Sequence, residues 1–132
     1  MKIGIFSDTH LPPTEDPRFS DSIATLERMV QGMIERKVDL VLFGGDVSTA
    51  EDGKPQVQVV EAFGRALERF AKVDYTHYSV PIVMIPGNTD LPRLGERSAL
   101  SALRWIPNIT VSHKPEVLTP GKASCTHSEQ IA

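Results

Sequence analysis

The chain has 132 residues, a net charge of −3, 40% hydrophobic residues and 23% charged residues, as expected of one soluble globular domain. The mild negative charge excludes a general electrostatic attraction to nucleic acid, and no run approaches the roughly 20 apolar residues of a membrane span. A single cysteine, Cys125, excludes an internal disulfide, and the first residues form no signal peptide, so we expect a cytoplasmic protein with no membrane partner.

The first apolar run, residues 3–6, has no polar alternation and predicts a strand buried on both faces. A proline-rich loop over residues 11–17 separates it from a predicted helix over residues 20–36. Apolar side chains in this helix recur at three- and four-residue steps, which gives it one apolar stripe. Three residues at its start are competent caps: Ser20, Asp21 and Ser22.

The rest of the chain continues the alternation of strands and helices. Strands are predicted over residues 39–43, 80–85, 109–111 and 123–125, and helices over residues 55–73 and 96–105. The last helix is expected to turn Leu100, Leu103 and Trp105 inward. This order is typical of a parallel sheet with right-handed crossovers. The predicted fold class is therefore α/β, a parallel sheet with flanking helices, in a single domain over residues 1–132.

Three polar clusters each follow a predicted strand. Asp8 and His10 follow the first strand, Asp46 follows the second after two glycines, and Asn88 follows the third. Asp8 and His10 are two residues apart, so on an extended segment their side chains point to the same side. Ligands of parallel sheets bind beyond the carboxyl ends of the strands, where all three clusters fall. Each cluster alone is typical of an ordinary turn, but together they predict a divalent metal site.

These clusters resemble the first three motifs of the calcineurin-like metallophosphoesterases, which read Asp-x-His, Gly-Asp and Gly-Asn-His-Asp/Glu. The matching segments are Asp8-Thr9-His10, Gly45-Asp46 and Gly87-Asn88-Thr89-Asp90. The resemblance covers residues 1–90 and implies the N-terminal half of the family's α/β sandwich. Within the family the sequence is most similar to the SbcD-type DNA repair nucleases, although small phosphodiesterases share the same opening motifs.

The resemblance implies two-metal hydrolysis of a phosphoester. Asp8 and His10 would hold the first metal, Asp46 would bridge both, and Asn88 would bind the second. Manganese is the favoured cation, with iron, zinc and magnesium as alternatives. The substrate would be DNA or a small phosphodiester. Four basic residues would hold a nucleic-acid backbone or simply form a solvated surface: Arg93, Arg97, Arg104 and Lys114.

Thr89 departs from the family's third motif, because it stands where the family has a histidine that assists the leaving group. Threonine cannot exchange a proton near neutral pH, so general acid catalysis would be lost. Asp90, which would orient that histidine, would then have nothing to orient. Thr89 and Asp90 are the candidate catalytic residues of a weakened site.

A second departure is that no Gly-His-x-His motif follows. The remaining histidines are His77, His113 and His127, of which His127 is a candidate substitute. We therefore expect one cation at Asp8, His10 and Asp46, and weak or absent activity. The alternative is a catalytically inactive module that binds a partner or a phosphorylated ligand.

The length of the chain is a third departure, because 132 residues supply about one of the family's two sheets. The open apolar face would be covered by a second copy in a homo-oligomer, or the sequence is a truncation of a longer enzyme.

Overall fold

The computed structural model describes residues 1–51, 53–72, 79–91, 97–114 and 117. Within them, four strands form one sheet in the order β1-β2-β3-β4, and every neighbouring pair is parallel. The strands are β1 (Ile3–Phe6), β2 (Leu40–Phe43), β3 (Ile82–Met84) and β4 (Ile109–Val111). The connections hold α1 (Phe19–Glu35), α2 (Val57–Glu68) and two short 3₁₀ helices, η1 (Arg69–Lys72) and η2 (Ala99–Trp105). The predicted α/β class with a parallel sheet is confirmed.

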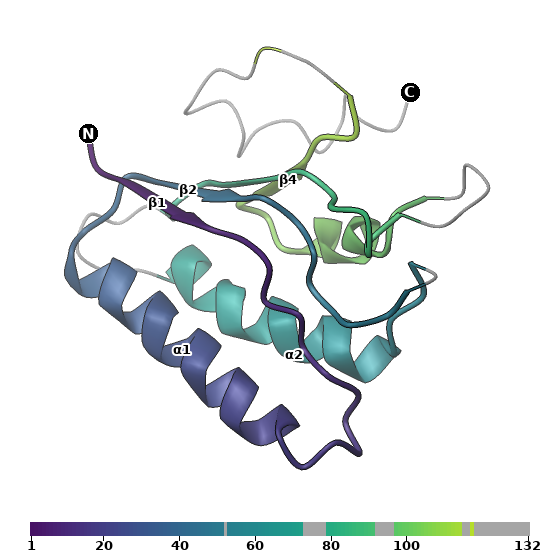
Figure 1. Ribbon diagram of the computed structural model, residues 1–132. Coiled ribbons are helices and arrows are strands. Elements are labelled where there is room, and N and C mark those ends of the chain that lie inside the picture. The colour runs from purple at the N-terminus through teal and green to yellow at the C-terminus, as the bar shows by residue number, and fades with distance from the viewer. Residues whose placement is uncertain (52, 73–78, 92–96, 115–116, 118–132) are drawn as a thin grey trace.

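The helices α1 and α2 lie side by side against one face of the sheet (Figure 1). Phe43 of β2 is buried in the core. Its ring lies 4.8 Å from that of Phe6 on β1 and 5.1 Å from that of Phe63 on α2. Leu26 and Val30 of α1 are buried in the same core, so the predicted apolar stripe of this helix does face the sheet.

Strand β1 is buried on one face only, so the prediction of burial on both faces was wrong. Gly4 and Phe6 are buried, whereas Ile3 is 42% exposed and Ile5 is 70% exposed. Gly4 lies so close to Met33 of α1 that a Cβ on it would sit 2.8 Å from the Met33 sulfur. Because both helices cover the same face, the other side chains of this edge strand remain exposed.

Helix α1 begins one residue before its predicted start, but none of the three predicted caps is used. The N-cap residue is Arg18, and its side chain makes no capping hydrogen bond. The Arg18 amide instead donates to Asp16 Oδ1 at 2.8 Å, and the Arg18 guanidinium contacts Asp16 Oδ2 at 2.7 Å. The guanidinium bond, followed by the amide bond, lowers the pKa of Asp16 to about 2. The carboxylate in the preceding loop thus orders the start of the helix.

All but one of the remaining described elements are shorter than predicted. Helix α2 begins at Val57 and gives way to η1 after Glu68, while β3 has three residues. Leu100 and Leu103 of η2 are buried as predicted, but Trp105 is 57% exposed, so its predicted inward position was wrong. Strand β4 has the bounds that were predicted, and the strand predicted at 123–125 lies outside the described residues. Neither α1 nor any other helix in the described part is long and apolar enough to cross a membrane.

Candidate metal centre

The chain segments that follow β1 and β2 run side by side beyond the sheet. The Asp8 amide donates to Gly45 O at 2.9 Å, and the His10 amide donates to Asp46 O at 3.1 Å. One residue further, the Leu11 amide donates to Val47 O at 2.8 Å, and the Thr9 hydroxyl donates to the same oxygen at 2.9 Å. This ladder brings two predicted ligands on the first loop alongside a third on the second.

The predicted ligands Asp8, His10 and Asp46 all have a left-handed backbone, with φ of 57°, 41° and 61°, respectively. The expectation that Asp8 and His10 belong to an extended segment was therefore wrong. Non-glycine residues rarely adopt this conformation, which costs about 1–3 kcal/mol and is found most often at functional sites. Only one other non-glycine residue in the described part has a positive φ, Lys37, just beyond the end of α1. The unusual backbone is thus concentrated at the predicted metal ligands.

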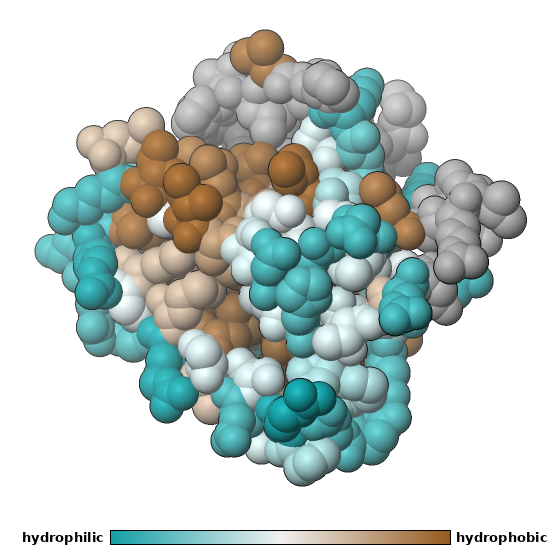
Figure 2. Space-filling model, viewed as in Figure 1, coloured by the Kyte–Doolittle hydropathy of each residue, from teal (hydrophilic) through white to brown (hydrophobic). Residues whose placement is uncertain are grey.

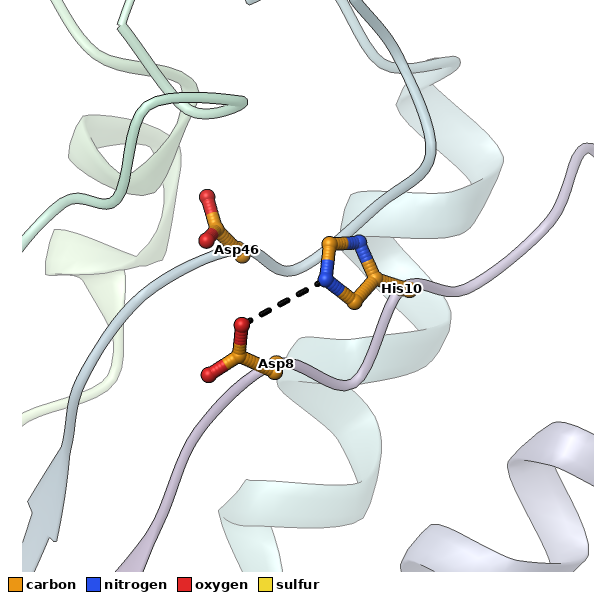
Figure 3. A group of neighbouring side chains, drawn as sticks. All are labelled: Asp8, His10 and Asp46. Carbon is orange, nitrogen blue, oxygen red and sulfur yellow. Dashed lines mark ion pairs between the residues drawn. The ribbon is translucent and has the colours of Figure 1, made fainter.

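The side chains of Asp8, His10 and Asp46 converge on one point. One ligand atom from each lies within 4.8 Å of the other two, and His10 Nε2 is 3.4 Å from Asp8 Oδ1. Figure 3 shows Asp8 and His10 on the loop after β1, with Asp46 on the neighbouring loop across from them. The Asp8 and His10 side chains are exposed and Asp46 is half-buried, so the group is open to solvent.

The three donors fit a divalent transition-metal ion. Two ligands at about 2.0–2.2 Å from one ion lie at most about 4.4 Å apart, so small side-chain rotations would close the group around a cation. Two carboxylates and one imidazole are a donor set that manganese, iron and zinc accept, whereas calcium prefers oxygen ligands alone.

The loop after β3 completes this side of the centre by contacting Asp46. The backbone amide and the hydroxyl of Thr89 both donate to Asp46 Oδ1, each at 2.9 Å. With its amide nitrogen turned toward the carboxylate, Asn88 donates to Asp46 Oδ1 at 3.3 Å and to Oδ2 at 3.2 Å. The predicted ligand Asn88 therefore lies beside Asp46, with which it was predicted to share the second metal.

The pKa of the Asp46 carboxyl is lowered by these donors. The Thr89 amide has the largest effect, and the Thr89 hydroxyl, the charge of His10 and a hydrogen bond with Asp8 add to it. Burial raises the pKa, but by less than the donors together lower it. Asp46 is thus held in the anionic form that binds a cation.

Two glycines allow the second and third loops to touch. Gly45 has a φ of 95°, and a Cβ on it would lie 2.7 Å from Gly87 Cα. A Cβ on Gly87 would lie 2.7 Å from the Asp46 amide nitrogen and would clash with the Asp46 carboxylate. Only glycine leaves room for this approach, which accounts for the glycine before each of the two predicted ligands Asp46 and Asn88.

Asp90 is buried, with 1% of its surface exposed. Within the described residues, the hydrogen-bond donors to its carboxylate are all backbone amides. It was expected to have nothing to orient, but its carboxylate accepts hydrogen bonds from Gly87, Asp46 and Val47. These contacts join loops that are 44 residues apart in sequence, and sequence reasoning missed them. The only signal was an acidic residue closing a Gly-Asn-Thr-Asp turn.

The other histidines and the basic residues named from the sequence are, where the structure describes them, not part of the group formed by Asp8, His10 and Asp46. His113 is exposed overall, with Nε2 at 3.4 Å from Ser101 Oγ. Partial desolvation of its ring, followed by the nearby Arg104 charge, lowers its pKa. Arg97 and Lys114 are exposed. His77, Arg93 and His127 lie outside the described residues.

The sequence matches the family model of the calcineurin-like phosphoesterases over residues 1–130. The match extends well beyond Asp90, where the motif resemblance ends. A comparison with curated proteins gave no significant match.

Proposed function

The chain belongs to the calcineurin-like phosphoesterase family, and we propose that it is a phosphodiesterase that works with one divalent cation held by Asp8, His10 and Asp46. The observation that carries this proposal is the convergence of these three side chains at the carboxyl ends of β1 and β2. A cation bound there would lower the pKa of water and neutralise charge on the phosphoryl oxygens.

Manganese is our preferred cation, because it accepts both carboxylate and imidazole ligands. One equivalent is favoured over two, since Thr89 already donates two hydrogen bonds to Asp46 Oδ1. A second cation would have to displace these donors and recruit the neutral amide of Asn88. Calorimetric titration that found two equivalents at submicromolar affinity would contradict this stoichiometry.

Slow turnover is part of the proposal, because Thr89 cannot protonate a leaving group near neutral pH. Its hydroxyl proton is also directed toward Asp46 Oδ1. The residues of the third loop would therefore hold the metal ligand and leave the departing alkoxide to solvent.

The substrate class is a phosphodiester, either a DNA backbone or a small molecule. The exposed cations of Arg97 and Lys114 support a nucleic-acid backbone as one candidate. The single cysteine supports a cytoplasmic location for such an enzyme.

The test is hydrolysis of bis-p-nitrophenyl phosphate and of single-stranded DNA with Mn²⁺, comparing the wild type with Asp46→Asn. We expect slow hydrolysis by the wild type and none by the variant. Asp21→Asn, at an exposed carboxylate on α1, is the matched control and is expected to keep wild-type activity. Equal rates for Asp46→Asn and the wild type would overturn the proposal.

A second candidate function is a non-catalytic module that binds a phosphorylated ligand or a protein partner. Thr89 at the position of the family's histidine favours it. Binding of Mn²⁺ with hydrolysis of neither substrate would support the module over the enzyme.

A further inference from the structure

We propose that Asp90 is a positioning residue for the metal ligand Asp46. Its buried carboxylate fixes the backbone of the loop after β2 against the loop after β3, and this holds Asp46 in its left-handed ligand conformation. The inference rests on the proposed function for its link to a cation, but the positioning itself is a property of the metal-free chain.

Both oxygens of the Asp90 carboxylate are occupied by backbone donors. Oδ2 accepts from the Asp46 amide at 2.6 Å and from the Gly87 amide at 2.8 Å. Oδ1 accepts from the Val47 amide at 3.0 Å. Successive amides such as those of Asp46 and Val47 form a concave anion site, and a carboxylate that accepts several of them is strongly held.

Because Asp90 is buried, its carboxylate depends on these three backbone donors. At 1% exposure, water cannot replace the three donors, and a buried anion without donors is strongly unfavourable. The loop after β2 must therefore keep the Asp46 and Val47 amides aimed at Asp90 for the fold to accommodate the charge. This requirement fixes the backbone at Asp46, where φ is 61°.

The same short loop holds Asp46 from two sides. Asp90 binds its backbone amide, while Thr89 binds its side-chain Oδ1. With the amide and the carboxylate of Asp46 both held by consecutive residues, the ligand has one arrangement, and it is the one that faces Asp8 and His10.

This geometry separates Asp90 from the residues that would touch substrate. Its buried oxygens are taken up by the three amides, so it is poorly placed to bind a cation or to exchange a proton with substrate. Asp90 thus acts through Asp46, whereas the family resemblance implied a residue left with no histidine to orient.

Asp90→Asn keeps the size of the side chain but removes its charge and turns an NH₂ group toward a backbone donor. We expect Mn²⁺ affinity, measured by calorimetry, to fall about 10–100-fold, the usual effect of losing a group that supports a metal ligand. Amide hydrogen exchange at Asp46 and Val47 is expected to accelerate in the metal-free protein.

Asn108→Ala is the matched control. Asn108 is equally buried, at 1% exposure, and its side-chain amide donates to Val80 O at 2.6 Å, next to the starts of β3 and β4. The control is expected to lose stability while keeping Mn²⁺ affinity within about threefold. As long as the variant remains folded, a loss of stability leaves the metal site formed. Equal loss of affinity in both variants would reduce Asp90 to a general structural role and overturn the inference.

The exchange measurement distinguishes this inference from the proposed function. If the wild type binds no Mn²⁺ but Asp90→Asn accelerates exchange at Asp46 and Val47, the metal function fails and the positioning role stands. Unchanged exchange and unchanged affinity in a folded Asp90→Asn variant would overturn the positioning role. If that variant does not fold, hydrogen exchange in the wild type provides the test. The amides of Asp46 and Val47 lie beyond β2, but the inference requires that they be protected from exchange. Rapid exchange at these amides would contradict it.

Discussion

Thr89 donates both its backbone amide and its hydroxyl to a single oxygen of Asp46, Oδ1, at 2.9 Å in each case. In the family's third motif this position is a histidine, which contacts the scissile phosphate. Here the side chain binds the predicted metal ligand Asp46 instead. The consequence is a well-held carboxylate, beside a residue that cannot protonate a leaving group near neutral pH.

Thr89→His is expected to raise the turnover of single-stranded DNA with Mn²⁺, because its alkoxide leaving group needs a proton, whereas p-nitrophenolate leaves readily without one. General acid assistance typically contributes about 10²–10⁴-fold, and the backbone amide at position 89 would still donate to Asp46. Steady-state kcat near pH 7 measures the change. Thr89→Val, which removes the hydroxyl without adding an imidazole, is the control and should give no gain. Equal kcat in the histidine and valine variants would count against this explanation of the weak activity that we predict.

The pKa of Asp46 offers a test of the Thr89 contacts that needs no metal. The Thr89 amide is the largest cause of the lowered pKa and remains in Thr89→Val, whereas the hydroxyl is lost. The variant pKa should therefore rise toward the ordinary value of 3.8 without reaching it. Carbon-detected NMR titration of the Asp46 carboxyl measures this shift, and Thr89→Ser, which keeps the hydroxyl, should titrate as the wild type does.

The sign of the linked stability change follows from that lowered pKa. An Asp46 carboxyl with a depressed pKa stabilises the fold at pH above 3.8, and this contribution disappears as the pH falls through its folded value. Thr89→Val should thus be less stable than the wild type near pH 6, with the difference shrinking in acid. A difference that grows in acid would contradict the assignment.

Much of the fold could be predicted from local pattern. Helix α1 and strand β4 were predicted to within one residue, because each has an apolar repeat bounded by polar or proline residues. The exposure of Ile5 could not be predicted in this way. An apolar run specifies a strand, but which of its faces is covered depends on where α1 and α2 pack after the chain has folded.

The candidate site, like the fold, could be predicted from the sequence only in part. Asp8, His10 and Asp46 were predicted together, since parallel strands place their carboxyl ends at one edge of the sheet. Their left-handed backbone and the role of Asp90 arise from contacts between loops far apart in sequence. No local pattern encodes such contacts, because they form only when the loops meet in the folded chain.

Gly87→Ala tests the close approach of the second and third loops. The added Cβ would lie 2.7 Å from the Asp46 amide nitrogen and would clash with the carboxylate, so Asp46 must move. We expect Mn²⁺ affinity to fall at least about tenfold, in line with the loss of a supporting contact, and the melting temperature to drop. Calorimetry and thermal unfolding measure the two effects.

Gly32→Ala provides the control for that substitution. Gly32 is in α1, and a Cβ there would meet only the flexible end of Arg36 at 3.0 Å. Alanine is a better helix former than glycine by about 0.5–1 kcal/mol, so this variant should be at least as stable as the wild type and bind Mn²⁺ equally well. Gly87→Ala with unchanged affinity would show that the two loops can separate without disturbing the ligand.

The exposed apolar side chains of β1 predict self-association of the chain. Ile5 is 70% exposed and Ile3 42% exposed on an edge strand of the described sheet, and no charged residue interrupts β1. Figure 2 shows hydrophobic surface gathered near the start of this strand, at the upper left of the view. Natural edge strands often carry lysine to prevent pairing with another chain, and β1 lacks this protection. A second copy is the partner we expect at this edge.

Ile5→Lys should shift the protein toward the monomer, as measured by sedimentation velocity over a range of concentrations. Its stability should change by no more than about 0.5 kcal/mol, because the side chain is already in water. Val57→Lys is the matched control, since Val57 is 68% exposed but lies at the start of α2. The control should associate as the wild type does. A wild type that stays monomeric at every concentration would contradict the prediction, as would equal dissociation of the two variants, because either result would show that the β1 edge is not where copies of the chain meet.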